Sequence, residues 1–247
     1  MKRPEYSYLD PRAIILVGPP GSGKGTQAAK LSPELGIPAV STGEMLRREC
    51  QSGSSLGRAV QAILSSGQLV SDGLMNQVVS SRLRHADCRN GFILDGYPRT
   101  VSQARFLEGL LPELQIPDRI VFHFEISKDN VFSRLTRRLQ CAQCGRIYSE
   151  KSDAMGAEML CDGDGSKLIH RSDDNAALIP ERLRLYEANA SPLLRFYRNR
   201  GCYRVNANRS PEEVSRELLS IVRGTSPIRL VPTRARAKAA TQPSYSV

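Results

Sequence analysis

Short hydrophobic runs alternate with stretches of helical periodicity along most of the chain. The clearest run, AIILV at 13–17, has the length and β-branched content of a strand buried on both faces. Further strands are predicted at 38–40, 92–95, 119–126 and 202–205. Helical patterns occupy 26–35, 45–51, 56–66, 74–83, 101–114, 130–139, 179–200 and 211–222. This alternation predicts an α/β fold with a parallel, doubly wound sheet, which binds its ligand at the carboxyl ends of the strands.

Three stretches depart from this alternation. Residues 41–70 insert two helical segments between strands. Residues 141–175 are rich in Gly, Asp and Ser, lack helical periodicity and are too long for a plain loop, so they predict a small subdomain with its own stabilising device. Residues 223–247 carry five basic residues, no acidic residue and three prolines, and this composition predicts a disordered tail.

The segment GPPGSGKGTQ, at 18–27, is typical of a phosphate-binding loop because it follows a predicted strand and opens a predicted helix. Its glycines let backbone N–H groups converge on phosphate oxygens, and the helix N-terminus adds a positive dipole. Lys24 is placed to contact the β- and γ-phosphates. A glycine follows Lys24, so the hydroxyl that usually ligates magnesium is either that of Thr26 or absent.

A second candidate phosphate site is FILDGYPRT, at 92–100. Asp95 ends a hydrophobic strand, where a carboxylate can anchor Mg²⁺ directly or through its waters. Arg99 would bring a guanidinium fork suited to phosphate into the same crevice. Phosphoryl transfer needs positioning and charge neutralisation rather than a nucleophilic side chain, and no Ser-His-Asp or Cys-His constellation competes with this interpretation.

Three of the six cysteines cluster as Cys141-x-x-Cys144 and, after sixteen residues, Cys161-x-x-Asp164. Two short chelating pairs suit tetrahedral Zn²⁺, and the clustering indicates a metal site in a reducing cytoplasm rather than disulfides. In the alternative interpretation the cysteines are free thiols and Asp164 is a turn acid. Zinc would be structural, because a polar, Gly-rich insert buries too little apolar surface to fold alone.

Composition adds a question about charge. The 247 residues include 35 Lys and Arg against 25 Asp and Glu, a net charge of +10, which indicates nucleic acid, an anionic membrane or small phosphorylated ligands as partners. No apolar run approaches the roughly 20 residues that span a bilayer. The charged residues at 1–12 are not followed by the apolar segment of a secretory signal. We therefore expect a cytoplasmic protein that does not enter a membrane.

Three motifs, in this order, resemble the adenylate kinase family of nucleoside monophosphate kinases, in its long form with a zinc-type lid. They are GPPGSGKGTQ at 18–27, STGEMLR at 41–47, and LDGYPRT at 94–100 with Gln103 after it. The resemblance implies a P-loop kinase with a five-stranded parallel sheet flanked by helices, spanning 13–222 between an N-terminal extension (1–12) and the tail. It also implies an AMP-binding insert at 41–70 and a lid insert at 137–174. The implied reaction is reversible transfer of the γ-phosphoryl group of MgATP to AMP, giving two ADP.

The same resemblance implies roles for individual residues. The implied ATP-binding residues are Gly21, Ser22, Gly23, Lys24, Gly25, Thr26, Arg134, Tyr148 and Arg209. Those for AMP are Thr42, Arg47, Leu69, Val70, Gly96, Arg99, Gln103, Arg171 and Arg182. The implied catalytic set is Lys24, Arg99, Arg134, Arg138, Arg171, Arg182 and, near Mg²⁺, Asp95. The implied zinc ligands are Cys141, Cys144, Cys161 and Asp164, while Asp173 would pair with an arginine. Glu44 stands where the family usually has Asp.

ATP, AMP and ADP are the expected partners, and a monomer is expected from the resemblance. Two alternatives stay open. One is a GTP:AMP phosphotransferase or another nucleoside monophosphate kinase, because the sequence discriminates the donor base poorly. The other is a nucleic-acid-binding P-loop ATPase with a zinc knuckle. Against this second alternative, aromatic residues make up only 6% and form no basic-aromatic stripe, so no nucleic acid is expected on the folded part.

Overall fold

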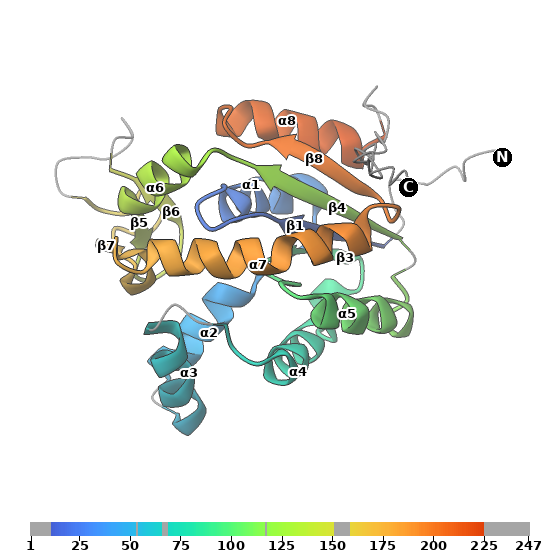
Figure 1. Cartoon of the computed structure of the whole chain (residues 1–247), viewed down its shortest axis with the longest axis horizontal. Helices are drawn as coiled ribbons and strands as arrows, with labels where there is room; N and C mark the ends of the chain where they lie inside the picture. The colour runs from blue at the N-terminus through green and yellow to red at the C-terminus, as the bar shows by residue number, and fades with distance from the viewer. Residues whose placement is uncertain (1–10, 53, 66–68, 117, 151–158, 225–247) are drawn as a thin grey trace, which may run out of the picture.

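Five parallel strands form the central sheet of the computed structural model (Figure 1). In spatial order they are β2 (Ala39–Ser41), β3 (Gly91–Asp95), β1 (Arg12–Val17), β4 (Asp118–Glu125) and β8 (Cys202–Asn206). The predicted five-stranded parallel sheet is therefore confirmed. Because all strands run the same way, the phosphate-binding loop after β1 and the end of β3 lie at the same edge of the sheet.

Helices cover both faces of this sheet (Figure 1). One face packs against α1 (Lys24–Leu35) and α8 (Pro211–Val222), and the other against α4 (Asp72–Leu83), α5 (Val101–Glu113) and α7 (Ile179–Tyr197). Side chains of β1 alternate between the two cores. Ile14 and Leu16 join the α1–α8 side, whereas Ile15 joins the α4–α5–α7 side. This two-sided burial explains why β1 is hydrophobic without interruption.

Two groups of elements project beyond the carboxyl ends of the strands. We call α2 (Thr42–Gln51) and α3 (Ser55–Ser65), which follow β2, the helical insert. After α6 (Lys128–Thr136), a small antiparallel sheet forms in the order β6-β5-β7. We call this sheet and the 3₁₀ turn η2 (Ser172–Asp174) the strand insert. The strands of the small sheet are β5 (Arg138–Cys141), β6 (Ile147–Ser149) and β7 (Leu168–His170), and a second 3₁₀ turn, η1, lies at Ala86–Cys88.

The helix predicted at 130–139 is wrong at its C-terminal end. It stops at Thr136, and the following residues pair with two other strands as β5. Leu139 and Cys141 are buried with Cys161 in a small core inside the strand insert. The side chain of the intervening Gln140 bonds instead to Glu44 of α2 and to Arg171. Leu139 follows Val131 and Leu135 at a spacing of four, so the helical periodicity of the sequence continues two residues beyond the point where the helix gives way to β5.

The structure describes residues 11–52, 54–65, 69–116, 118–150 and 159–224. The tail predicted to be disordered lies outside these residues from 225 onward, as do residues 1–10 of the predicted extension. Within the described residues, none of the helices combines the length and apolarity needed to cross a bilayer.

Candidate functional site

A cavity of about 590 Å³ lies at the carboxyl ends of the strands and is lined by residues of the core and of both inserts. Every residue predicted from the sequence to contact ATP or AMP lines this cavity, together with Asp95 and Arg138 of the predicted catalytic set. The four predicted metal ligands form a separate cluster in the strand insert. The cavity is therefore where the dispersed motifs meet.

The phosphate-binding loop wraps one end of the cavity. Gly21 (φ 75°) and Gly23 (φ 92°) adopt left-handed conformations that favour glycine. The Lys24 ammonium folds back over the loop and donates hydrogen bonds to the carbonyl oxygens of Gly18 (2.8 Å) and Pro19 (2.7 Å). These bonds hold the ammonium at the mouth of the loop, beside the first backbone N–H groups of α1.

Burial lowers the pKa of Lys24 to about 8. The carboxylate of Asp95 opposes this shift, while the charges of nearby arginines, led by Arg99, reinforce it. Burial also lowers the pKa of Arg99 and that of Arg171, where Arg138 acts in the same direction. Each of these cations is therefore stabilised less than it would be in water, and an anion placed among them gains from their charge.

Charge in the cavity is strongly unbalanced. Among the residues that the structure describes, eight cationic side chains line it, against two carboxylates. The cations are Lys24, Arg47, Arg99, Arg134, Arg138, Arg171, Arg182 and Arg209, and the carboxylates are Asp95 and Asp173. An excess of this size in a partly desolvated space suits a polyphosphate far better than a neutral ligand.

Two carboxylates in η2 hold the arginines around them. Asp173 pairs with Arg182 at 3.2 Å, so the predicted acid–arginine pair is present. The next residue, Asp174, was missed from the sequence, although its side chain is almost fully buried. It accepts hydrogen bonds from Arg138 (Nε, 2.6 Å) and Arg182 (2.8 Å). The adjacent acids in HRSDD were the available signal, since a buried carboxylate needs a cationic partner.

The opposite end of the cavity carries the predicted AMP residues. Gln103 is buried, donates from Nε2 to Asp72 (2.7 Å) and accepts at Oε1 from the backbone N–H of Arg99 (2.7 Å). Thr100 donates to the other oxygen of Asp72 at 2.8 Å. Asp72 was not predicted from the sequence, because its role depends on the approach of α4 to α5. Together these bonds fix the orientation of the Gln103 amide.

The metal candidates meet as their spacing predicts. One ligand atom from each of Cys141, Cys144, Cys161 and Asp164 lies within 4.8 Å of all the others. The Sγ atoms of Cys144 and Cys161 are 3.6 Å apart, close to the separation of about 3.8 Å that tetrahedral bonds of 2.3 Å to zinc require. Backbone N–H groups also point at the sulfur of Cys141, at 3.3 Å. This donor set fits a thiolate-bound ion.

Asp164 has a second role in the same cluster. Its carboxylate accepts a hydrogen bond from the backbone N–H of Ser166 at 2.9 Å, as a turn acid does. It also lies 3.3 Å from the Cys141 sulfur. The turn therefore aims the carboxylate at the thiols, and the two interpretations of Asp164 are compatible.

The phosphate-binding loop, the parallel sheet and the cationic cavity define a P-loop phosphotransferase. A family model described as adenylate kinase matches residues 16–202. The chain belongs to the adenylate kinase family. It is an enzyme that transfers a phosphoryl group reversibly between ATP and AMP, and this function is favoured over the two alternatives left open by the sequence.

Relatives named adenylate kinase align with most of the chain. The relative from Thermosipho melanesiensis is 41% identical over 211 residues, covering 85% of this chain and 99% of that protein. The relative from Fervidobacterium nodosum is 39% identical and covers 85% and 97%, respectively. One from Methanosarcina acetivorans is 42% identical over 188 residues, covering 76% and 87%. The similarity therefore includes the core and both inserts.

The lowered pKa of Lys24 predicts proton uptake when ATP binds near pH 8. Phosphate oxygens favour the charged ammonium, so binding raises this pKa and draws in a proton, and ATP affinity falls as pH rises above 8. Calorimetric titrations at pH 8 in two buffers of different ionisation enthalpy measure the uptake. Lys24→Arg, which stays charged, should reduce it. Equal binding heats in both buffers for the unmodified protein would contradict the assignment.

Proposed function

We propose that ATP and AMP bind at opposite ends of the cavity, with their phosphate chains meeting among the eight cations. One observation carries this proposal: the predicted residues of both nucleotide sites line a single continuous cavity. Direct transfer requires donor and acceptor oxygens to approach in line, which a shared cavity permits. Fixed positive charge then stabilises the phosphoryl group in transit.

The donor end is assigned to the phosphate-binding loop. Backbone N–H groups of residues 21–26 would cradle the β-phosphate, with Lys24 reaching the γ-phosphate. Tyr148, Arg134 and Arg209 line the cavity beyond the loop and would contact ATP. Arg134 is anchored there by a 2.8 Å hydrogen bond to the carbonyl of Ala207.

Magnesium fits the same end. The Thr26 hydroxyl and the Asp95 carboxylate both line the cavity, and they supply the oxygen ligands that Mg²⁺ prefers. When bound with ATP, the ion neutralises charge on the phosphates. Asp95 also offsets the positive charge around Lys24, and its carboxylate therefore opposes the lowering of the Lys24 pKa by burial.

The acceptor end is assigned to the AMP residues. Arg47 and Arg99 would bind the phosphate of AMP, and Gln103 would recognise its adenine beside the apolar wall of Leu69 and Val70. Arg99 is oriented by donation from its Nε to the carbonyl of Gly96, at 2.8 Å. Thr42 and Gly96 complete this end of the cavity. The Thr42 hydroxyl donates a hydrogen bond to the backbone carbonyl oxygen of Asp95 in β3, at 3.3 Å.

The remaining arginines would hold the phosphoryl group during transfer. Arg138 and Arg182 share the carboxylate of Asp174, which fixes both guanidinium groups toward the cavity. Arg171, the residue directly after β7, also lines the cavity. We propose that the helical insert (within 41–70) and the strand insert (within 137–174) act as the AMP-binding insert and the lid. Their closure would exclude water, so that AMP rather than water accepts the phosphoryl group.

We further propose that Cys141, Cys144, Cys161 and Asp164 bind one structural Zn²⁺. Among its described residues, the small core of the strand insert contains few buried side chains, so a metal ion would supply much of its stability. All six cysteines are free, which supports a reducing compartment and a cytoplasmic enzyme. The proposed assembly is a monomer whose folded part binds nucleotides rather than nucleic acid.

Arg99→Ala is expected to lower kcat by about 10²–10³-fold, because it removes a preorganised cation from the phosphate path. The measurement is ADP formation from ATP and AMP, with a melting curve to show that the fold persists. Arg105→Ala, at an exposed arginine of α5, is the matched control and should leave kcat unchanged. Near-normal activity of Arg99→Ala would contradict the site assignment.

Substrate choice tests the two ends separately. With ATP as donor, AMP should be preferred over GMP, CMP and UMP, because the fixed Gln103 amide matches adenine. With AMP as acceptor, replacing ATP by GTP examines the donor base. Equal use of GMP and AMP would overturn the role of Gln103.

Metal analysis of protein purified without chelator should find about one zinc per chain. Cys144→Ser should lower the zinc content and the melting temperature, because the strand insert loses a thiolate ligand. Cys50→Ser, on α2 and outside the cluster, is the control and should keep the zinc. Absence of zinc from the unmodified protein would count against the site.

A further inference from the structure

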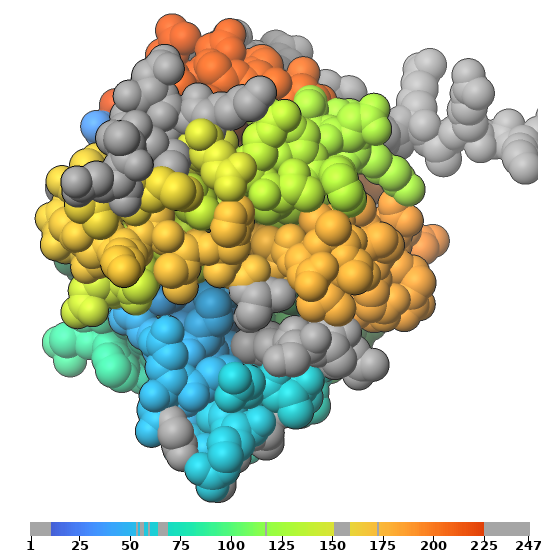
Figure 2. Space-filling model, turned by 90° about the vertical axis from the view of Figure 1, so that its left-hand side faces the viewer, coloured from blue at the N-terminus to red at the C-terminus, as the bar shows by residue number. Residues whose placement is uncertain are grey.

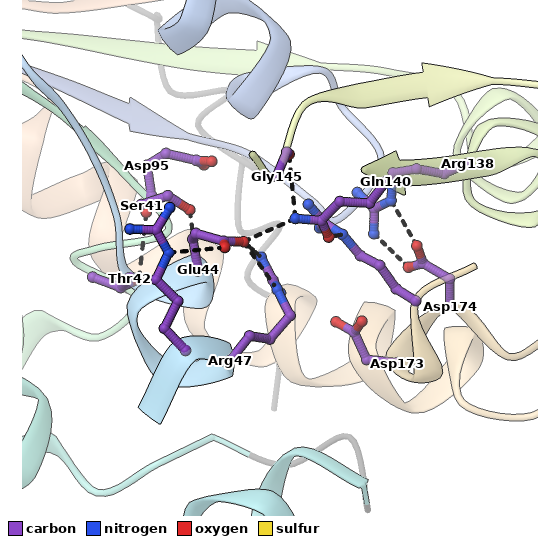
Figure 3. A network of polar contacts seen from close by, with 12 residues as sticks. Ser41, Thr42, Glu44, Arg47, Asp95, Arg138, Gln140, Gly145, Asp173 and Asp174 are labelled. Atoms are coloured by element: carbon purple, nitrogen blue, oxygen red, sulfur yellow. Dashed lines mark hydrogen bonds and ion pairs between the residues drawn. The ribbon is translucent and has the colours of Figure 1, made fainter. Parts of the chain in front are cut away.

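Gln140, a residue with no predicted role, bridges the two inserts. It lies on β5 of the strand insert and is 7% exposed. Its Nε2 donates to Glu44 Oε2 of α2 at 2.9 Å, and its Oε1 accepts from Arg171 Nε at 2.5 Å. Figure 3 shows its side chain reaching from β5 toward Glu44. Figure 2 shows the yellow surface of the strand insert meeting the blue surface of α2.

Charge fixes the orientation of this amide. The guanidinium of Arg171 requires an acceptor, and the carboxylate of Glu44 requires a donor. A rotated amide would set its NH₂ group against the guanidinium, donor against donor, and its carbonyl against the carboxylate, acceptor against acceptor. The second N–H is also used, since Nε2 lies 3.2 Å from the carbonyl oxygen of Gly145. Glutamine carries both a donor and an acceptor group, so it satisfies Glu44 and Arg171 at once, which a carboxylate or an apolar side chain of this size cannot do.

Glu44 carries the connection onward to the helical insert. Its carboxylate accepts from Arg47 at 3.3 Å and from Arg48 at 3.3 Å. Burial raises the pKa of Glu44, but the hydrogen bond from Gln140 and the charges of Arg47 and Arg48 outweigh burial and leave this pKa below its ordinary value. Glu44 is therefore an ionised acceptor at neutral pH. Figure 3 shows its carboxylate between the side chains of Arg47 and Gln140.

The chain of bonds thus joins two phosphate-site arginines that lie on different inserts. Arg171 lies just after β7, while Arg47 lies on α2, and both line the cavity. Within the described residues, the Nε of Arg171 donates its hydrogen bond to the side chain of Gln140. Burial makes a loose guanidinium costly here, so its direction depends on this acceptor.

We propose that Gln140 is a positioning residue that orients Arg171 only when Glu44, on the opposite insert, lies against it. Approach of the helical insert would then set the lid arginine in place for transfer, so that AMP binding prepares the catalytic arrangement around ATP. This inference rests on the proposed roles of Arg47 and Arg171. It assigns Gln140 no contact with substrate, and its effect is transmitted through Arg171.

The test reverses the hydrogen-bond direction. Gln140→Glu alone sets two carboxylates against each other and should lower kcat by about tenfold, a loss typical of a broken bond to a charged group, while the KM values for ATP and AMP change less. Adding Glu44→Gln lets the amide donate to the new carboxylate, which still accepts from Arg171. The double variant should recover most of the lost kcat, although Glu44→Gln by itself should be mildly harmful.

The matched control is Gln61→Glu, which makes the same charge change at an exposed glutamine of α3 in the helical insert. It should leave kcat unchanged in the unmodified protein and, when combined with Glu44→Gln, should give the kcat of Glu44→Gln alone. Melting curves accompany every variant. If Gln140→Glu does not fold, Gln140→Leu replaces it and should show a similar loss of kcat that Glu44→Gln does not restore.

Two results would overturn the inference: normal kcat in Gln140→Leu, or purely additive effects of the two substitutions in Gln140→Glu and Glu44→Gln. Arg171→Ala separates this failure from failure of the proposed function. If Arg171→Ala loses activity while the Gln140 variants do not, only the positioning role is wrong. If Arg171→Ala is fully active, the proposed role of Arg171 fails first.

Discussion

Repulsion among cations that share one partly desolvated cavity is the constraint that shapes the functional half of this molecule. Within the described part of the chain, eight positive side chains converge on one cavity, where desolvation lowers the pKa of Lys24, Arg99 and Arg171. The fold opposes this cost with acceptors of its own. Backbone carbonyls hold Lys24, and the buried carboxylate of Asp174 holds two arginines at once. Lys24, Arg138 and Arg182 are thereby oriented before a polyphosphate arrives, so they stabilise its charge without a large rearrangement of their own.

The parallel sheet makes this concentration of charge possible. Its strands end at one edge, so the loop after β1 and the motif after β3 are neighbours although they are far apart in sequence. The two inserts then add arginines from above that edge. A rigid core thus positions Lys24 and Arg99, while elements outside the core supply Arg47, Arg138 and Arg171. The positioning proposal for Gln140 concerns the contact between these outer elements.

The sequence predicted the sheet and the phosphate-binding loop because their signals are local, whereas most of the other nucleotide-site residues were assigned through the resemblance to adenylate kinases. An uninterrupted apolar run marks β1, and a glycine-rich loop marks Lys24. The missed features depend on tertiary approach. Glu44 and Gln140 are 96 positions apart, and no periodicity reports such a contact. Asp72 and Asp174 were missed because their partners come from distant parts of the chain. The helix predicted at 130–139 ran two residues into β5 because Leu139 continues the spacing of Val131 and Leu135.

The central claim is that closure around a cationic cavity directs phosphate to AMP rather than to water. Quantifying ADP and inorganic phosphate, with ATP supplied with and without AMP, tests this claim most directly. We expect two ADP for each ATP consumed, with almost no inorganic phosphate and almost no turnover when AMP is absent. Steady release of inorganic phosphate that does not depend on AMP would contradict the account.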